Sequence, residues 1–105
     1  MNRNFRHAPE NWSLQTAHKA ADKEKIKLTD AHWDLIASLQ EYFSKHDGKI
    51  NMRSLADALD ESFHHKGGLT YLHTLFPEGP IAQGCKIAGL KPPPGAVDES
   101  FGSTA

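Results

Sequence analysis

Residues 29–45 carry the clearest repeating pattern in this sequence, and that pattern predicts an amphipathic α-helix. The apolar residues recur at the spacing that places side chains on one face of a helix: Leu35, Ile36, Leu39, Tyr42 and Phe43. Thr29 is a suitable N-cap, and Asp30 in the first turn interacts favourably with the helix dipole. We expect the helix to end near residues 44–45, because Asp47-Gly48 supplies a turn and a left-handed residue.

Glycine and proline residues divide the remaining sequence into four further helical segments. The predicted ranges are residues 12–24, 51–66, 69–76 and 80–89. Asn51 is a suitable N-cap, and Pro80 suits a first helical turn. Gly67-Gly68 and Gly89 are expected to end the segments that precede them. No alternating pattern of useful length is present, so the sequence predicts helices only.

The length of 105 residues leaves room for one hydrophobic core. We therefore predict an all-α fold, a small single domain of about five crossing helices with a Pro-rich C-terminal arm. The helical domain is expected to span residues 12–95, and the run Pro92-Pro93-Pro94 near its end favours extended backbone. Residues 1–11 are expected to form a flexible N-terminal arm and residues 96–105 a mobile C-terminal tail.

Composition excludes several classes of protein. Hydrophobic residues make up 38% of the chain and charged residues 24%, values typical of a folded domain. A formal net charge of -1 argues against binding nucleic acid by bulk charge. No apolar run approaches the roughly 20 residues of a membrane span, and the basic N-terminus lacks the apolar stretch of a signal peptide. A single cysteine excludes an internal disulfide, so we expect a cytoplasmic protein without a membrane partner.

Cys85 is the residue with the strongest nucleophilic potential, because a thiolate reacts readily near neutral pH. Gly84 leaves the neighbouring backbone open to close approach, and the cation of Lys86 could lower the pKa of the thiol. The alternative is structural. Cys85 follows Ile81 by one helical turn, and a lone cysteine commonly behaves as a small buried hydrophobe. From the residues alone, both interpretations remain open.

The histidines do not form a recognisable metal site. His64, His65 and His73 fit neither an i, i+4 pair on one helix nor a zinc-finger spacing. His64 and His65 precede Gly67-Gly68, and cations suit the C-terminal end of a helix. The sequence also lacks a Gly-rich phosphate loop, so we expect neither a metal nor another cofactor.

A helix-turn-helix is the strongest argument for a nucleic-acid partner. Residues 51–66 and 69–76 flank the Gly-Gly turn, and the residues that could contact phosphates are Arg53, His65, Lys66 and His73. The second of these helices is mostly apolar, however, and offers few side chains that read bases. A plain pair of packed helices is the simpler explanation, and DNA binding is kept as an alternative.

Three sequence blocks, by their order and spacing, resemble the DsrC/TusE family of sulfur-relay proteins. They are Leu28-Thr29-Asp30-Ala31-His32-Trp33, Leu75-Phe76-Pro77-Glu78-Gly79-Pro80 and Cys85-Lys86-Ile87-Ala88-Gly89-Leu90. The resemblance extends from about Trp12 to Gly95. It implies a small cytoplasmic helical protein that carries sulfur on a cysteine near the end of a flexible C-terminal arm. The partners that it implies are a dissimilatory sulfite reductase or the relay that supplies sulfur for tRNA 2-thiolation.

The sequence departs from this family at the arm. Cys85 falls on the position of an earlier, second cysteine that the sulfite-reductase type carries. The position of the terminal arm cysteine, just after Pro94-Gly95, is occupied by Ala96, which has no nucleophile. The short N-terminal β-hairpin common in the family is not expected here. The block Ile50-Asn51-Met52-Arg53 keeps only the arginine of the family's entry to the third helix.

We therefore expect a divergent sulfur-metabolism protein that acts through protein–protein contacts, more as a carrier or accessory protein than as a stand-alone enzyme. Cys85 is the candidate sulfur-carrying thiol, and the candidate partner-binding residues are Arg53, Lys86 and Lys91. Thiol exchange needs only an accessible thiolate and an activated sulfur on the partner. The alternatives are a regulatory paralogue that docks without transferring sulfur, and a helix-turn-helix regulator.

Overall fold

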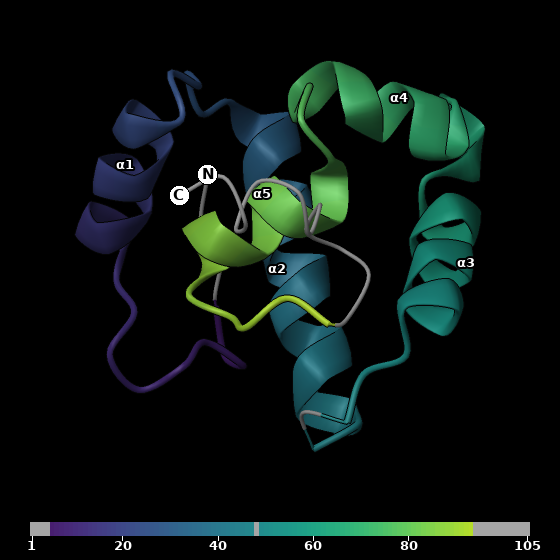
Figure 1. Ribbon diagram of the computed structural model, residues 1–105, viewed down its shortest axis with the longest axis horizontal. Helices are drawn as coiled ribbons and strands as arrows, with labels where there is room; N and C mark the ends of the chain where they lie inside the picture. The colour runs from purple at the N-terminus through teal and green to yellow at the C-terminus, as the bar shows by residue number, and fades with distance from the viewer. Residues whose placement is uncertain (1–4, 48, 94–105) are drawn as a thin grey trace, which may run out of the picture.

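The computed structural model describes residues 5–47 and 49–93, and all regular secondary structure within these residues is helical (Figure 1). The helices are α1 (Leu14–Lys23), α2 (Asp30–Lys45), α3 (Met52–Ser62), the short 3-10 helix η1 (His64–Lys66), α4 (Gly68–Leu75) and α5 (Pro80–Ala88). The prediction of an all-α domain with five helices is confirmed. No helix of the described residues is both long and apolar enough to cross a bilayer.

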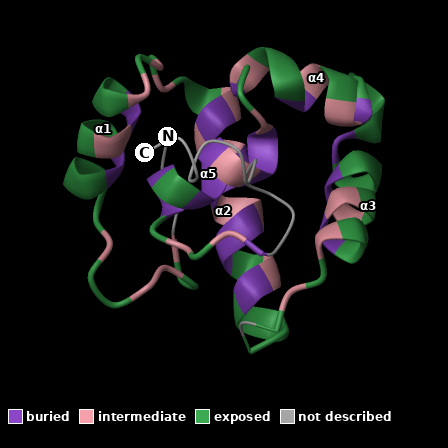
Figure 2. Cartoon of the chain, viewed as in Figure 1, coloured by how far each residue is buried: buried purple, intermediate pink, exposed green. Residues whose placement is uncertain are grey.

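The last helix, α5, lies at the centre of the molecule. It crosses α2 and also contacts α1 and α4, while α3 packs chiefly on α4 (Figure 1). Seven of the nine residues of α5 are buried, whereas the outer helices bury one face and expose the other (Figure 2). A helix that is covered nearly all round holds the other elements together, so α5 forms the core of the fold.

Gly84 allows α5 to approach α2 closely. A Cβ atom at this position would lie 2.7 Å from Cδ1 of Leu39, closer than side-chain contacts normally allow. The close approach that the sequence predicts at Gly84 is therefore made by Leu39 of the protein itself, which fills the space. Dense packing of this kind is typical of protein interiors.

The start of α2 is joined to the end of α4 by His32, which is 7% exposed. The Nδ1 atom of His32 accepts a hydrogen bond from the backbone N–H of Thr29 at 3.1 Å. Its Nε2 atom lies 2.9 Å from the carbonyl oxygen of Leu75, and since a carbonyl only accepts, Nε2 carries the proton. The imidazole also meets the ring of Phe76 edge-on, with the centroids 5.0 Å apart. His32 thus completes the cap of α2 and fixes α4 against it.

The connection between α3 and α4 differs from the prediction. The third helix ends at Ser62 and not at Gly67-Gly68, and η1 occupies the intervening residues. Gly67 is the C-cap of η1 and also the N-cap of α4, which begins at Gly68; the φ angles of the two residues, 123° and 65°, favour glycine. A side chain at Gly68 would collide with the carboxylate of Asp60, which accepts a hydrogen bond from the backbone N–H of Leu69 at 2.9 Å.

The turn after α2 contains the left-handed residue that the sequence predicts within Asp47-Gly48. Asp47 adopts this conformation with a φ angle of 52°, and Gly48 lies outside the described residues. Asp tolerates this conformation better than most residues with a side chain.

The N-terminal residues pack on the domain through aromatic rings. The ring centroid of Phe5 lies 5.0 Å from that of Trp12 and 5.8 Å from that of Trp33.

Candidate functional site

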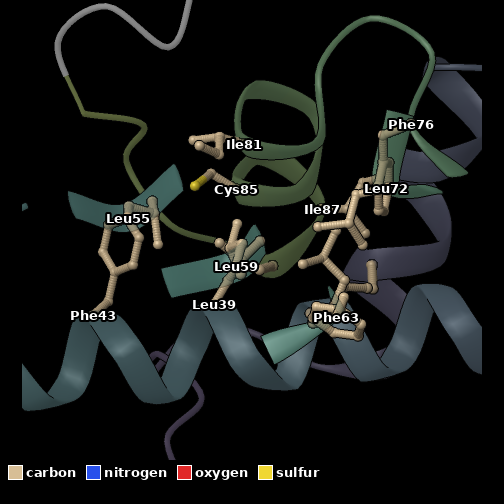
Figure 3. Packing of buried hydrophobic residues seen from close by; sticks show 14 of the residues in the cluster. Leu39, Phe43, Leu55, Leu59, Phe63, Leu72, Phe76, Ile81, Cys85 and Ile87 are labelled. Carbon is tan, nitrogen blue, oxygen red and sulfur yellow. The ribbon is translucent and has the colours of Figure 1, made fainter. Parts of the chain in front are cut away.

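Cys85 lies in the hydrophobic core and is 0% exposed. Figure 3 shows its side chain beside Ile81 of the same helix, with Leu55 of α3 and Leu39 of α2 nearby. The helical face that the sequence predicted, Ile81 followed by Cys85 one turn later, is the buried face of α5. In this conformation the thiol has no open path to a partner protein.

Burial raises the pKa of the Cys85 thiol from 9.0 to about 12, because a thiolate would lose its solvation in the core. At neutral pH the residue is therefore an uncharged thiol. The suggestion that Lys86 lowers this pKa is wrong. Neighbouring residues point to different sides of a helix, and the ammonium of Lys86 faces Glu24, with Nζ and Oε2 3.6 Å apart.

Lys86 belongs to a group of polar contacts that joins α5 to the end of α1. Gln83 is buried, and its Nε2 donates a hydrogen bond to Oε1 of Glu24 at 3.0 Å. The Oε1 atom of Gln83 accepts a hydrogen bond from the backbone N–H of Glu78, also at 3.0 Å. Gln83 and Lys86 therefore hold the two oxygens of one carboxylate, and this part of the surface is engaged within the fold.

The C-terminal end of α5 is the root of the Pro-rich arm, and its last four carbonyl groups all accept hydrogen bonds. The donors are Leu90 N to Cys85 O at 2.8 Å, Gly89 N to Lys86 O at 3.4 Å, Trp12 Nε1 to Ile87 O at 2.8 Å and Gln40 Nε2 to Ala88 O at 2.9 Å. A helix end normally leaves these carbonyls without intrahelical partners. Here the chain satisfies every one, so the root of the arm is fixed to the domain.

Trp12 and Gln40 are the residues of this root that sequence reasoning missed. Gly89 takes a left-handed φ angle of 78°, and a Cβ there would lie 2.8 Å from Cδ1 of Trp12. Gln40 is 1% exposed, which is unusual for an uncharged polar side chain on the apolar face of a helix. Its place in that apolar pattern was the signal available in the sequence. Trp12 is separated from Ile87 by 75 positions, so local patterns could not join them.

The arm leaves the root at Leu90 without helical structure, and within the described residues it ends at Pro93. Lys91 is exposed and Pro93 is buried. Gly95, Ala96 and the predicted mobile tail lie outside the described residues.

The three candidate partner-binding residues do not form one surface around Cys85. Arg53 is exposed on α3, Lys91 is exposed on the arm, and Lys86 faces the end of α1. Since α1 and α3 lie on opposite sides of α5, Lys86 and Arg53 are separated by the body of the domain (Figure 1). Their roles remain predictions.

Neither a metal site nor a DNA-reading helix emerges from the described residues. No group of three or more His, Cys, Asp or Glu side chains among them could hold a metal ion. In the helix-turn-helix candidate, α4 buries Leu72 and exposes Thr70, His73 and Thr74. These short or weakly basic side chains offer little for reading base edges.

Three comparisons relate the chain to proteins that are already known. The family model described as "DsrC like protein" matches residues 2–97. A relative from Haemophilus influenzae named "Sulfurtransferase TusE homolog" is 38% identical over 85 residues, which cover 80% of this chain and 78% of the relative. The "Sulfurtransferase TusE" of Buchnera aphidicola is 38% identical over 84 residues, covering 79% of this chain and 74% of that protein.

A solved structure shares the fold. The NMR structure of Allochromatium vinosum DsrC matches with a TM-score of 0.68 and 35% sequence identity, covering 87% of this chain and 85% of the other. Sequence and structure comparisons therefore agree with the resemblance carried by the three motif blocks.

Proposed function

The chain belongs to the DsrC family, and from that premise we propose that it works in sulfur metabolism by docking on the proteins of a sulfur relay. Relatives that match about 80% of this chain carry the name sulfurtransferase, which supports a role beside proteins that pass sulfur from one cysteine to another. The protein acts through contact with such partners and not as an enzyme with a turnover of its own.

The observation that carries the docking proposal is the environment of Cys85. The thiol is buried, and a pKa raised from 9.0 to about 12 lowers the thiolate population at neutral pH roughly a thousandfold. The position where the family carries its arm cysteine holds Ala96. A chain with the family scaffold and no accessible thiolate binds relay partners without accepting sulfur from them.

The second candidate is a carrier that uses Cys85 after the core opens locally. The thiol lies one helical turn before the arm root at Leu90, so displacement of the arm and of α3 would uncover it. In that event the Cys85 thiolate attacks the outer sulfur of a donor persulfide. The S–S bond of the donor breaks, its thiolate leaves and a persulfide remains on Cys85, with no net oxidation.

Intact-protein mass spectrometry after incubation with a cysteine-persulfide donor separates the two candidates. We expect the folded chain to gain no sulfur, whereas the same chain in denaturant gains the mass of one sulfur atom. Cys85→Ser serves as the control that gains none in either condition. An added sulfur on the folded chain, absent from Cys85→Ser, would replace the docking proposal with the carrier.

Calorimetric titration tests docking itself. The titrated partner is a purified dissimilatory sulfite reductase or a purified protein of the tRNA 2-thiolation relay. We expect binding, and we expect Cys85→Ser to bind with unchanged affinity because the thiol lies inside the core. Absence of binding by the unmodified, folded chain would overturn the proposed function. Loss of binding in Cys85→Ser, with the fold intact by circular dichroism, would contradict the docking-only version.

A further inference from the structure

Four exposed lysines gather where α1 ends and the chain turns towards α2. They are Lys19, Lys23, Lys25 and Lys27, and we call this surface the basic end of α1. Lys19 and Lys23 are one helical turn apart, so their Cβ atoms are about 6 Å from each other. The Cα atoms of Lys25 and Lys27 are at most about 7 Å apart. Helix α1 lies at the edge of the molecule, and its outer turns are exposed (Figures 1 and 2).

The basic end of α1 keeps its positive charge within the fold. No ion pair within residues 5–47 and 49–93 includes any of the four lysines. Glu24 lies among them in the sequence, but its two oxygens are held by Gln83 and Lys86. Asp22 is the acidic residue that remains, so four lysines and one aspartate give this surface a formal charge of +3. The total of -1 therefore leaves -4 on the rest of the sequence, and the near-neutral total conceals a strong separation of charge.

The turn that carries Lys25 uses a residue that the backbone does not favour. The N–H of Lys25 donates to the carbonyl of Asp22 at 3.1 Å, and the N–H of Ile26 donates to that of Ala21 at 2.9 Å. This pattern ends a helix with a left-handed residue that is usually glycine, as at Gly89 after α5. Here a lysine takes that conformation, with a φ angle of 59°.

The needs of the fold do not account for these lysines. The dipole of α1 favours a cation in its last turn, which explains Lys23 but not Lys25 or Lys27 beyond the helix. Lys19 and Lys23 are like charges one turn apart and repel each other. Strained backbone and unpaired like charges tend to occur together at functional sites. The basic end of α1 therefore has the properties of a binding surface for an acidic partner.

The chemistry of this surface fits the carboxylates of a protein and not a nucleic acid. Lysine is a point charge and lacks the planar fork with which arginine binds phosphate. Single-stranded nucleic acids also need exposed aromatic rings on which bases stack. The ring beside α1 is that of Trp33, which is half-buried and meets the rings of His18 and Phe5, with centroids 5.3 Å and 5.8 Å away. The charge of -4 on the remaining sequence repels a long polyanion.

From these observations we propose that the basic end of α1 receives an acidic face of a protein partner. Attraction between opposite charges mainly accelerates association and sets the orientation of the encounter. The inference rests on the proposed function, because it names the face on which docking begins. It involves no sulfur transfer, and it places this face across the domain from Arg53 on α3.

Association kinetics with purified dissimilatory sulfite reductase, or with a purified protein of the tRNA 2-thiolation relay, test the proposal. We expect the double substitution Lys23→Gln and Lys27→Gln to lower the association rate constant roughly tenfold at low ionic strength and to leave dissociation nearly unchanged. The matched control is Lys49→Gln with Lys66→Gln, which removes the same charge from exposed lysines elsewhere and should change the rate less than about twofold. Equal effects of the two variants would overturn the proposal and leave docking intact.

Lys25→Gly provides a second variant in which a fault in folding cannot imitate the expected result. Glycine relieves the left-handed strain, so we expect the melting temperature to rise while association becomes slower. A structural role alone would leave association unchanged. A more stable variant that associates as fast as the unmodified chain would therefore overturn the proposal.

Amide NMR with a short polyglutamate peptide examines the surface without a relay partner. We expect the peptide to shift the amides of residues 19–27, and we expect added salt to reverse these shifts. Equal shifts around Lys49 and Lys66 would show unspecific attraction and overturn the proposal. It is also overturned if, at physiological ionic strength, a short oligouridylate shifts the amides of residues 19–27 and the peptide does not. Localised peptide shifts without binding of any relay partner would refute the proposed function and support the surface.

Discussion

The motif blocks that characterise this chain consist of residues that hold the backbone in place. His32 caps α2 and binds the carbonyl of Leu75, and Gly89 turns the chain at the end of α5; Gly84, just before the third block, admits the side chain of Leu39. These roles are structural, and none of them involves a reaction. A family resemblance carried by such residues therefore establishes the scaffold, while the reactivity of a cysteine depends on its surroundings.

Replacing His32 tests the first of these tasks. We expect His32→Ala to lower the free energy of unfolding by about 2–4 kcal/mol, because it removes the hydrogen bonds to Thr29 and to the Leu75 carbonyl and leaves these partners unsatisfied beside a buried ring. Urea unfolding followed by circular dichroism measures the change. His64→Ala, on an exposed side chain, is the control and should stay within about 0.5 kcal/mol of the unmodified protein.

The raised pKa of Cys85 predicts a dependence of stability on pH. In the unfolded chain the thiol ionises near its ordinary value of 9.0, whereas in the folded chain it stays protonated up to about 12. Between these values the unfolded state binds fewer protons, so stability falls as pH rises, by about 1.4 kcal/mol per pH unit. Below pH 9 the residue contributes no dependence.

Denaturant unfolding at several pH values above 9 measures this slope. Lysine and tyrosine residues also titrate in this range, so the comparison is with Cys85→Ala, which lacks the thiol. We expect the difference in unfolding free energy between the two proteins to shrink as pH rises. Parallel curves would show that Cys85 ionises equally well in the folded state.

At the scale of elements, the periodic patterns predict the helices well and their ends less well. Thr29 and Asn51 are the N-caps of α2 and α3, as the sequence indicates. The glycine pair was assigned to the end of α3 because glycine commonly terminates helices. In the structure α3 already ends at Ser62 and the pair links η1 to α4, where the carboxylate of Asp60 accepts a hydrogen bond from the N–H of Leu69. That contact depends on tertiary structure, which local patterns do not contain.

For the candidate site too, the sequence predicts the local pattern but not the tertiary contacts. The spacing of Ile81 and Cys85 predicts that the thiol shares an apolar face, and the alternative of a buried cysteine follows from it. The depth of that burial depends on α3 and α2, which cover the face from distant parts of the sequence. The hydrogen bonds that fix the arm root likewise join residues far apart, as between Gln40 and Ala88.

The arm root allows a prediction about an element. Trp12→Phe keeps most of the ring but removes the donor to the Ile87 carbonyl, so we expect a loss of about 1–3 kcal/mol and faster amide exchange at Leu90. Gln40→Leu should cost less. It loses the bond to the Ala88 carbonyl, but it also removes the buried Oε1, which has no hydrogen-bond partner among the described residues.

Denaturant unfolding and hydrogen exchange measured on both variants decide this prediction. In Gln40→Leu, the lost hydrogen bond lowers stability and the removal of an unsatisfied oxygen raises it. Trp12→Phe loses a hydrogen bond with no such compensation. Equal losses for the two substitutions would show that the orphan oxygen carries no penalty. Unchanged exchange at Leu90 in Trp12→Phe would show that the root is held by the backbone bonds of Gly89 and Leu90 alone.

At the scale of the whole molecule, the central position of α5 joins core and arm in one helix. The helices α1, α2 and α4 contact α5, α3 helps to cover the face that carries Cys85, and the C-terminal end of α5 is also the start of the arm. A small domain with one core usually unfolds in a single cooperative transition. Opening the helices around α5 therefore disturbs much of the packing, and in the closed conformation the thiol stays covered.

Because Cys85 is buried in the core, its reactivity reports whether the protein is folded. A thiol reagent reaches the sulfur only in molecules whose core has opened, so the rate of labelling reports the size of that population. For a domain of ordinary stability this population is on the order of one molecule in several thousand or fewer. The protein can therefore meet oxidants and electrophiles with its one cysteine unreacted, and chemical damage at that residue would mark molecules that had already lost their fold.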